Sequence, residues 1–263
     1  MKAFISDGFT VGTDGDVNGN TKTYVAWNWK AGGTAASNTD GTITSSVSAN
    51  PTAGFSIVSY TGTGTAGTKT IGHGLSQTPE LVIVKDRDAA NAWIVGSSKG
   101  MDFTDYMILD TNAAAVDDDT MWGDTTPSSS VFTVSTAVQV DGASDFIAYC
   151  FHSVEGYSKV GSYEGNGNAD GTFVYTGFRP AFVMTKSVDS TSDWQMFDNK
   201  RAGYNVDNYK LAANDLDKHN DTTVFLDIVS NGIKLRGTSD PNIAETYIYI
   251  AFAESPFKTS NAR

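Results

Sequence analysis

The pattern of apolar and polar residues predicts short β-strands. In residues 22–29, β-branched and aromatic side chains dominate, and Val25, Trp27 and Trp29 fall on one face of an extended chain. Residues 81–84, Leu-Val-Ile-Val, form a continuous apolar run, which is typical of a strand covered on both faces. We therefore expect a β-strand in each of these segments.

The segments between the apolar runs carry turn-forming residues. Ser230-Asn231 lies between the apolar runs 223–229 and 232–235, and the dipeptide Asn231-Gly232 predicts a tight hairpin turn there. No window shows a sustained helical period, and only residues 105–109 are compatible with a single helical turn. The pattern as a whole predicts an all-β fold of antiparallel sandwiches.

Most of the chain is an internal repeat with a spacing of about one hundred residues. Two segments share the motif aromatic-Ser-x-Val followed by Ser-Tyr-x-Gly-x-Gly, with one residue inserted between the two halves in the second copy. Trp93 and Trp194 hold the same place in the two copies, which indicates that both rings pack in a core. The matched pairs of segments are 55–64 with 157–167, 79–85 with 180–186, and 145–151 with 246–252.

A third, partial copy stands at the N-terminus, because residues 8–13 resemble 131–136 and residues 23–29 resemble 145–151. Half a module would expose unpaired strand edges, so these strands need partners from the next module or from another copy of the chain. The predicted parts are a partial repeat at 1–31, a Gly/Ser/Thr-rich connection at 32–53 with one short strand around Thr42-Ile43-Thr44, and β-sandwich repeats at 54–155 and 156–263.

The charge and composition narrow the classes of partner. The chain has 18 basic and 30 acidic residues, a net charge of −12, which disfavours binding to nucleic acid or to anionic lipid surfaces. No apolar run approaches the roughly 20 residues needed to span a bilayer, and the first residues carry no signal-peptide pattern. We expect synthesis in a host cytoplasm without membrane insertion. The single cysteine, Cys150, lies in an apolar run and is expected to be a buried, inert thiol.

One acidic segment resembles the start of a calcium loop. Asp14, Asp16 and Asn18 match the spacing of the first ligands of an EF-hand loop, but the twelfth position, where that loop needs a bidentate Glu, is Val25. Two interpretations remain open, a solvated hairpin loop and a Ca²⁺ site. The sequence indicates no other cofactor.

A second acidic segment is the candidate ligand site. Asp117, Asp118 and Asp119 form a run of like charges, which is either a solvated loop or a cation site. Trp122 follows this run and has no counterpart in the other copy, so we expect it to be exposed. An exposed aromatic ring can stack on a sugar ring whose hydroxyl groups bond to Asp and Asn side chains. These four residues are therefore the predicted ligand-binding residues.

The sequence contains no recognisable catalytic motif. It has no nucleophile elbow, phosphate-binding loop or dinucleotide fingerprint. The histidines His73, His152 and His219 do not stand at metal-ligand spacing from one another or from Cys150, and His73 is expected to bond locally within a turn. We therefore predict that the protein is not an enzyme.

Several motifs together carry a family resemblance. They are residues 24–33, 54–62, 72–75, 154–159, 175–180 and 253–263. This combination resembles a repeated module of tail-fibre-like and other virion structural proteins of marine tailed phages, and the resemblance covers nearly the whole chain. It implies a lectin-like or jelly-roll-like β-sandwich near the end of a fibre, and it implies no catalytic residues.

The resemblance gives the expected function. We expect a non-enzymatic structural protein of the virion, most simply a tail-fibre or receptor-binding component that contacts host surface glycans during host attachment. By analogy with fibres it would be a homotrimer that binds other virion proteins. The alternatives are a capsid decoration or head-fibre protein without a ligand, a carbohydrate-binding module, and a polysaccharide depolymerase, which would need two carboxylates held across a cleft.

Overall fold

The chain is nearly all β-structure. The computed structural model describes residues 1–6, 8–201, 204–205, 207, 209–215 and 224–255. Strands take 40% of the chain and helices 5%, so the all-β prediction is confirmed. The chain divides into two units, Met1–Lys30 and Ala31–Arg263, and each is described by itself.

The first unit contains one antiparallel hairpin and one short helix. Strand β1 (Ala3–Ile5) pairs with β2 (Gly8–Thr10), and helix α1 spans Gly15–Asn18. The strand predicted at residues 22–29 is wrong, because this segment forms no strand. The segments that it resembles, 145–151 and 246–252, each pair on both sides within a sheet. A strand needs neighbours for its backbone N–H and C=O groups, and in this unit the only described strand pair is β1 with β2.

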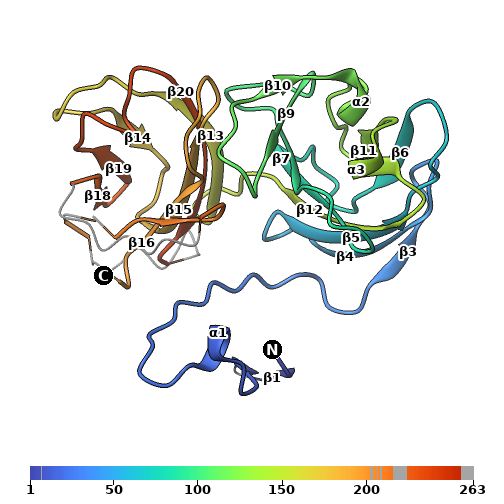
Figure 1. The fold of residues 1–263 in the computed structure, drawn as a ribbon, viewed down its shortest axis with the longest axis horizontal. Helices are drawn as coiled ribbons and strands as arrows, with labels where there is room; N and C mark the ends of the chain where they lie inside the picture. The colour runs from blue at the N-terminus through green and yellow to red at the C-terminus, as the bar shows by residue number, and fades with distance from the viewer. Residues whose placement is uncertain (7, 202–203, 206, 208, 216–223, 256–263) are drawn as a thin grey trace. The chain divides into compact units, whose positions relative to one another are not determined.

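The second unit begins with a sandwich that we call the first module. Its large sheet has eight strands in the order β10-β9-β8-β7-β12-β5-β4-β3, and its small sheet pairs β11 with β6. Helices α2 and α3 belong to the small-sheet side (Figure 1). The bounds are β3 Ala36–Asn38, β4 Ser45–Asn50, β5 Phe55–Thr61, β6 Lys69–Gly72, β7 Leu81–Asp86, β8 Ile94–Ser97, β9 Asp105–Ile108, β10 Val116–Asp117, α2 Asp119–Trp122, β11 Val131–Val134, α3 Val138–Asp141 and β12 Asp145–Phe151.

The segment predicted to be a surface connection is part of this module. Residues 32–53 supply β3 and β4, which extend the large sheet beyond β5. The short strand expected around Thr42-Ile43-Thr44 is a single parallel bridge between Ile43 and Ile71. Residues 105–109 do not form a helical turn, because Asp105–Ile108 is strand β9.

The second module repeats this plan with fewer strands. Its larger sheet has the order β13-β20-β15-β16-β17 and its smaller sheet the order β14-β19-β18. The hairpin predicted at Asn231-Gly232 is present, with Ser230 and Asn231 as its turn residues, since Val229 faces Gly232, the first residue of β19. The bounds are β13 Ser158–Glu164, β14 Phe173–Tyr175, β15 Pro180–Ser187, β16 Gln195–Asp198, β17 Leu211–Ala212, β18 Leu226–Val229, β19 Gly232–Leu235 and β20 Thr246–Ala253.

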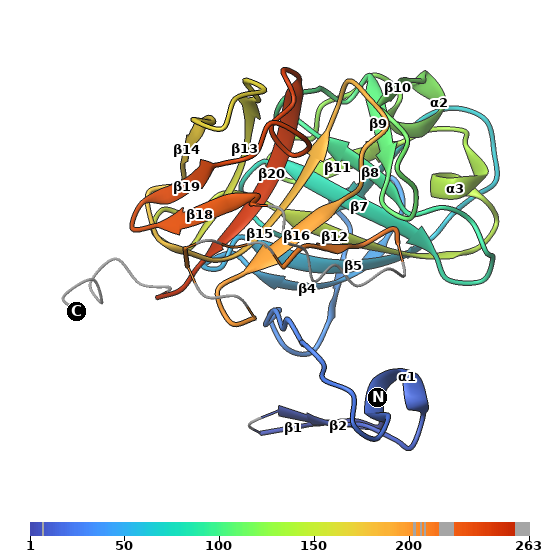
Figure 2. The same ribbon diagram turned by 60° about the vertical axis from the view of Figure 1, so that its left-hand side comes forward.

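Three apolar clusters hold four sheets in layers. One cluster fills the first module between its two sheets, and another fills the second module. The third joins the modules, because it combines Ile83 of β7 with Ile248 and Ile250 of β20. Figure 2 shows β15 and β20 in front of β7 and β12, in agreement with this packing. The expected strand at residues 81–84 is thus covered on both faces, since Val82 points into the first cluster and Ile83 into the third.

The repeat predicted from sequence extends to individual contacts. Trp93 N donates to Asp110 Oδ1 (3.0 Å), and Trp194 N donates to Asn214 Oδ1 (2.8 Å). The Trp194 ring is buried in the cluster between the modules, which confirms its place in a core, whereas the Trp93 ring is half-buried and packs against the same cluster. Register also corrects the alignment. Phe55 faces Phe151 and Ser158 faces Phe252, so β5 and β13 correspond residue by residue without an inserted residue.

Candidate ligand-binding face

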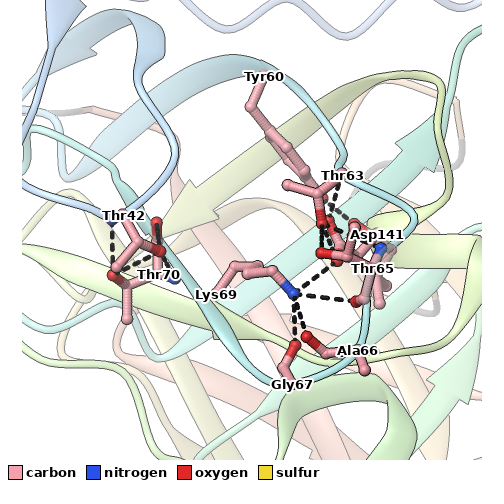
Figure 3. Close-up of polar contacts among 10 residues, drawn as sticks. Thr42, Tyr60, Thr63, Thr65, Ala66, Gly67, Lys69, Thr70 and Asp141 are labelled. Atoms are coloured by element: carbon pink, nitrogen blue, oxygen red, sulfur yellow. Dashed lines mark hydrogen bonds and ion pairs between the residues drawn. The ribbon is translucent and has the colours of Figure 1, made fainter.

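The polar residues of the repeated Tyr-x-Gly-x-Gly motif hold a loop in the first module. Tyr60 Oη donates to the carbonyl of Val140 (2.7 Å), and Thr63 N donates to Asp141 Oδ1 (2.8 Å). Lys69 Nζ lies 3.3 Å from Asp141 Oδ2 and donates to the carbonyls of residues 65–67 (Figure 3). These contacts, which we call the loop clamp, join the loop after β5 to the end of α3.

The second module builds the same loop clamp without a charge pair. Tyr163 Oη donates to the carbonyl of Pro241 (2.9 Å), and Asn166 N donates to Asn242 Oδ1 (3.2 Å). The Asn242 amide also donates to the carbonyls of Asn168 and Gly237. In the first module Asp141 has no such donor, and Lys69 donates to the loop carbonyls instead. The recurring polar residues of the repeat therefore serve the fold, and the candidate site lies where the modules differ.

One described difference between the modules concerns the outer surface of the small sheets. In the first module, Thr42 N donates to Thr70 Oγ1 and Thr70 N donates to Thr42 Oγ1, both at 2.9 Å (Figure 3). A side chain at Gly72 would collide with Asn38, whose Oδ1 lies 1.7 Å from the position of a Cβ atom. Residues 38–43 thus cover strand β6.

The corresponding strand of the second module carries exposed aromatic rings. The N–H groups of His73 and Thr176 donate to the equivalent carbonyls of Ser130 and Asn231, so Phe173 and Tyr175 take the places of Thr70 and Gly72. The Phe173 side chain is 46% exposed and the Tyr175 side chain 64% exposed. Both point outward from β14, because the residue between them, Val174, is buried in the core of the module.

Charged side chains flank these rings in register. Phe173 faces Lys234 on β19, and Lys234 faces Asp227 on β18, so the three lie in one row across the sheet. Lys234 Nζ pairs with Asp170 Oδ1 at 2.7 Å, and Asp227 pairs with Arg236 at 3.5 Å. The bond from Lys234 lowers the pKa of the Asp170 carboxyl, which keeps it an acceptor. We call Phe173, Tyr175, Lys234 and Asp227 the aromatic face.

The comparison with known proteins gives a family without an assigned role. The family described as a domain of unknown function, DUF7483, matches residues 1–256. The chain belongs to this family. No curated protein and no solved structure matches the DUF7483 chain.

The expectation that Trp122 is exposed is wrong. Trp122 is fully buried at the end of α2, where its ring packs edge-on against Phe103 with the centroids 5.5 Å apart. Helix α2 lies on the small-sheet side of the first module of this DUF7483 chain, and its other apolar residue, Met121, is buried beside Trp122. A large apolar ring at the end of such a helix gains more from the core than from solvent.

The acidic run beside Trp122 is a helix start. Asp118 caps α2, since its carboxylate accepts from Thr120 N (2.9 Å) and Thr120 Oγ1 (2.7 Å). Asp117 belongs to the edge strand β10, and Asp119 is the first residue of the helix. The three carboxylates and the Trp122 ring therefore do not form one surface, because the ring is buried.

The expected calcium loop at Asp14 contains helix α1. Asp14 Oδ1 accepts from Asp16 N (2.9 Å) and caps this helix, while the Asn18 amide donates to the Gly12 carbonyl (2.7 Å). These bonds hold the local turn, and the Ca²⁺ site stays a prediction. Within the residues that the structure describes, no three His, Cys, Asp or Glu side chains lie close enough together to hold a metal ion.

Two other predictions for single residues are confirmed. His73 is buried in its turn, where Nδ1 accepts from Leu75 N and Nε2 lies 3.2 Å from the Ser128 carbonyl. Cys150 is a buried free thiol, and burial raises its pKa to about 12. His219 lies outside the described residues. No helix in the described ranges has the length and apolar character to cross a membrane.

Sequence reasoning missed Phe173 and Tyr175. Their signal is the order aromatic-Val-aromatic on a strand, which places both rings on the face opposite Val174. Nothing in that order says which face is buried. That depends on the partner sheet and on the absence of a covering segment among the described residues of the second module.

Proposed function

We propose that this DUF7483 protein is a non-enzymatic structural component of a phage virion, a tail-fibre or receptor-binding part that contacts host surface glycans through the aromatic face. The observation that carries the proposal is the exposure of Phe173 and Tyr175 where the first module has the covered residues Thr70 and Gly72. Large exposed apolar groups that lie side by side usually mark a binding surface.

The chemistry of the aromatic face suits a neutral sugar chain. Aromatic rings present broad apolar surfaces on which the C–H face of a pyranose can lie, while polar groups at the rim bind hydroxyls. Lys234 and Asp227 supply such groups beside Phe173. The net charge of −12 disfavours polyanionic ligands at the same time.

The reuse of polar residues supports a structural rather than a catalytic role. The Tyr60 and Tyr163 hydroxyls and the side chains of Asp141 and Asn242 bond to loop backbone in both modules. Groups that are engaged in this way are not available for proton transfer to a substrate. The virion location and a homotrimeric assembly are part of the proposal and rest on the family resemblance.

The test is a glycan array followed by titration of any glycan that binds. Replacing Tyr175 or Phe173 by Ala should weaken binding roughly thirtyfold, the effect of losing about 2 kcal/mol at a central aromatic contact. Val138→Ala, which truncates an exposed side chain on α3, is the matched control and should bind normally. A wild-type protein that binds phage capsids but no glycan would contradict the proposal and favour a decoration protein.

A further inference from the structure

The first unit is ordered but has no core. Polar bonds hold its helix α1 in place, since Tyr24 Oη accepts from Gly19 N (2.7 Å) and donates to the Gly15 carbonyl (2.9 Å). None of the described residues of Met1–Lys30 is buried. A two-stranded hairpin without an apolar layer is marginally stable at best in water, so this unit needs a surface to pack against.

Exposed apolar side chains are concentrated on this unit. It holds six of the thirteen exposed large apolar side chains among the described residues, although it is only 30 residues long. Phe4 and Ile5 of β1 are 74% and 53% exposed. Phe4 faces Phe9 across the hairpin, so both rings lie on one face of it and Ile5 lies on the other. Apolar groups gathered in this way mark an interaction surface.

The described residues of the second unit offer few apolar partners for this surface. Their exposed large apolar side chains come from different segments of the chain, and only Phe173 and Tyr175 share an element. These two rings belong to the aromatic face, which the proposed function assigns to a ligand. The apolar surface that remains for the first unit is therefore the first unit of another copy.

The distribution of charge also favours contact between first units. Residues 1–30 contain three lysines and three aspartates, so the whole net charge of −12 lies in residues 31–263. A contact between second units would bring two acidic bodies together, whereas a contact between first units brings no net charge to the interface. Low net charge combined with exposed aromatic residues is typical of the centre of a protein interface.

We propose that the first units of separate copies associate through Phe4, Ile5 and Phe9, and that this unit is the oligomerisation element of the chain. The hairpins supply to one another the apolar layer that each lacks alone. Within the described residues β1 and β2 each pair on one side only, so their outer edges are available for pairing in the same contact. The number of three copies rests on the proposed function, and the association itself rests on the exposure and composition of the first unit.

The test is the mass of the full chain by light scattering, for the wild type and for the double variant Phe4→Ser with Ile5→Ser. We expect the wild type to associate and the double variant to fall to the mass of one 28.0 kDa chain at the same concentration. Val138→Ser, which makes the same kind of change at an exposed residue of α3, is the matched control and should keep the wild-type mass. Thermal unfolding of the second unit should not change in these variants, because its three apolar clusters contain no residue of the first unit.

A cross-link locates the contact independently of the mass. Cys150 is a buried free thiol and the single cysteine of the chain, so a cysteine introduced at the exposed Ala3 of β1 provides the accessible thiol. A short bis-maleimide should join Ala3→Cys chains into covalent oligomers and should leave Val138→Cys chains single. Equal cross-linking of the two variants would overturn the inference.

The mass and the glycan array together separate this inference from the proposed function. An unchanged mass in the double variant overturns the inference, while the trimeric assembly stands and another surface forms it. A monomeric wild type that binds glycan overturns the inference and leaves the glycan contact in place. A wild type that associates through the first unit but binds no host glycan supports the inference and contradicts the proposed function.

Discussion

At the residue scale, one polar side chain decides whether each loop clamp needs a balancing charge. In the first module, Asp141 is buried and receives Thr63 N, the Thr63 hydroxyl and Lys69 Nζ. In the second module, Asn242 supplies acceptor and donors from one amide. A carboxylate therefore needs a cation at this place, whereas an amide does not.

We expect Asp141→Ala to destabilise the protein by about 3–5 kcal/mol, because it leaves the partly buried Lys69 ammonium without its counter-charge. Asp141→Asn copies the residue of the second module and should cost clearly less. Urea unfolding of the two variants measures the difference. Equal losses would contradict the comparison between the modules.

A buried carboxyl gives the stability a pH dependence. Burial raises the pKa of Asp207 to about 7 from 3.8, and its Oδ2 has no partner among the described residues. Between these two pH values the folded protein keeps a proton that the unfolded chain has released. The contribution of Asp207 to the free energy of unfolding is therefore present below pH 4 and is lost as the pH rises to about 7.

We expect Asp207→Asn to stabilise the protein at pH 8 by up to about 4 kcal/mol relative to its effect at pH 4, because the amide cannot ionise. Urea midpoints of the wild type and the variant at both pH values measure this. A constant difference across the pH range would show that Asp207 does not titrate in this window.

At the scale of elements, one segment distinguishes the two small sheets. Residues 38–43 cover β6, and Asn38 occupies the space that a side chain at Gly72 would need. In β14, the Tyr175 ring stands at the equivalent place and is exposed. The same strand is therefore an internal element in one module and a surface in the other.

Replacing Gly72 by Tyr and Tyr175 by Gly should change the stability of the protein by unequal amounts. Gly72→Tyr forces Asn38 and its segment away from β6, and we expect a loss of about 1–3 kcal/mol or more from overpacking. Tyr175→Gly removes an exposed ring and should cost about 1 kcal/mol, the cost of Gly in a strand. Thermal unfolding of both variants is the measurement. A tolerated Gly72→Tyr would mean that residues 38–43 do not cover β6.

At the scale of the whole molecule, the two modules of the second unit act as one body. Their larger sheets share an apolar cluster that contains Leu81, Ile83, Val95, Ile248 and Ile250. The Trp194 indole also donates to the Ile108 carbonyl of the first module (2.8 Å). An apolar interface of this kind favours one cooperative unfolding transition for both modules.

The proposed assembly leads to a direct measurement of mass. If the protein is a homotrimer, light scattering or native mass spectrometry should give the mass of three copies of the 28.0 kDa chain. Dilution should not change this mass if the assembly is obligate. A monomer at all concentrations would contradict the trimeric fibre and favour a decoration protein.

Local patterns determined much of the fold. Alternating and continuous apolar runs mark the strands, Asn231-Gly232 marks the hairpin, and the paired Trp93 and Trp194 mark the duplication. These features depend on neighbours along the chain, since side chains alternate across a strand and short polar residues favour the turn between two apolar runs. The sequence by itself therefore determined the fold class, the repeat and the packing of the paired tryptophans against one apolar cluster.

Only the tertiary structure decided which segments find partners and which faces stay exposed. Residues 22–29 have the residue types of a central strand but pair with no described strand, whereas the polar residues 45–50 become strand β4 because β5 offers an edge. Coverage by distant segments likewise decides that Trp122 is buried and Tyr175 is exposed. Pairing and coverage depend on residues distant in sequence, so a local pattern cannot encode them.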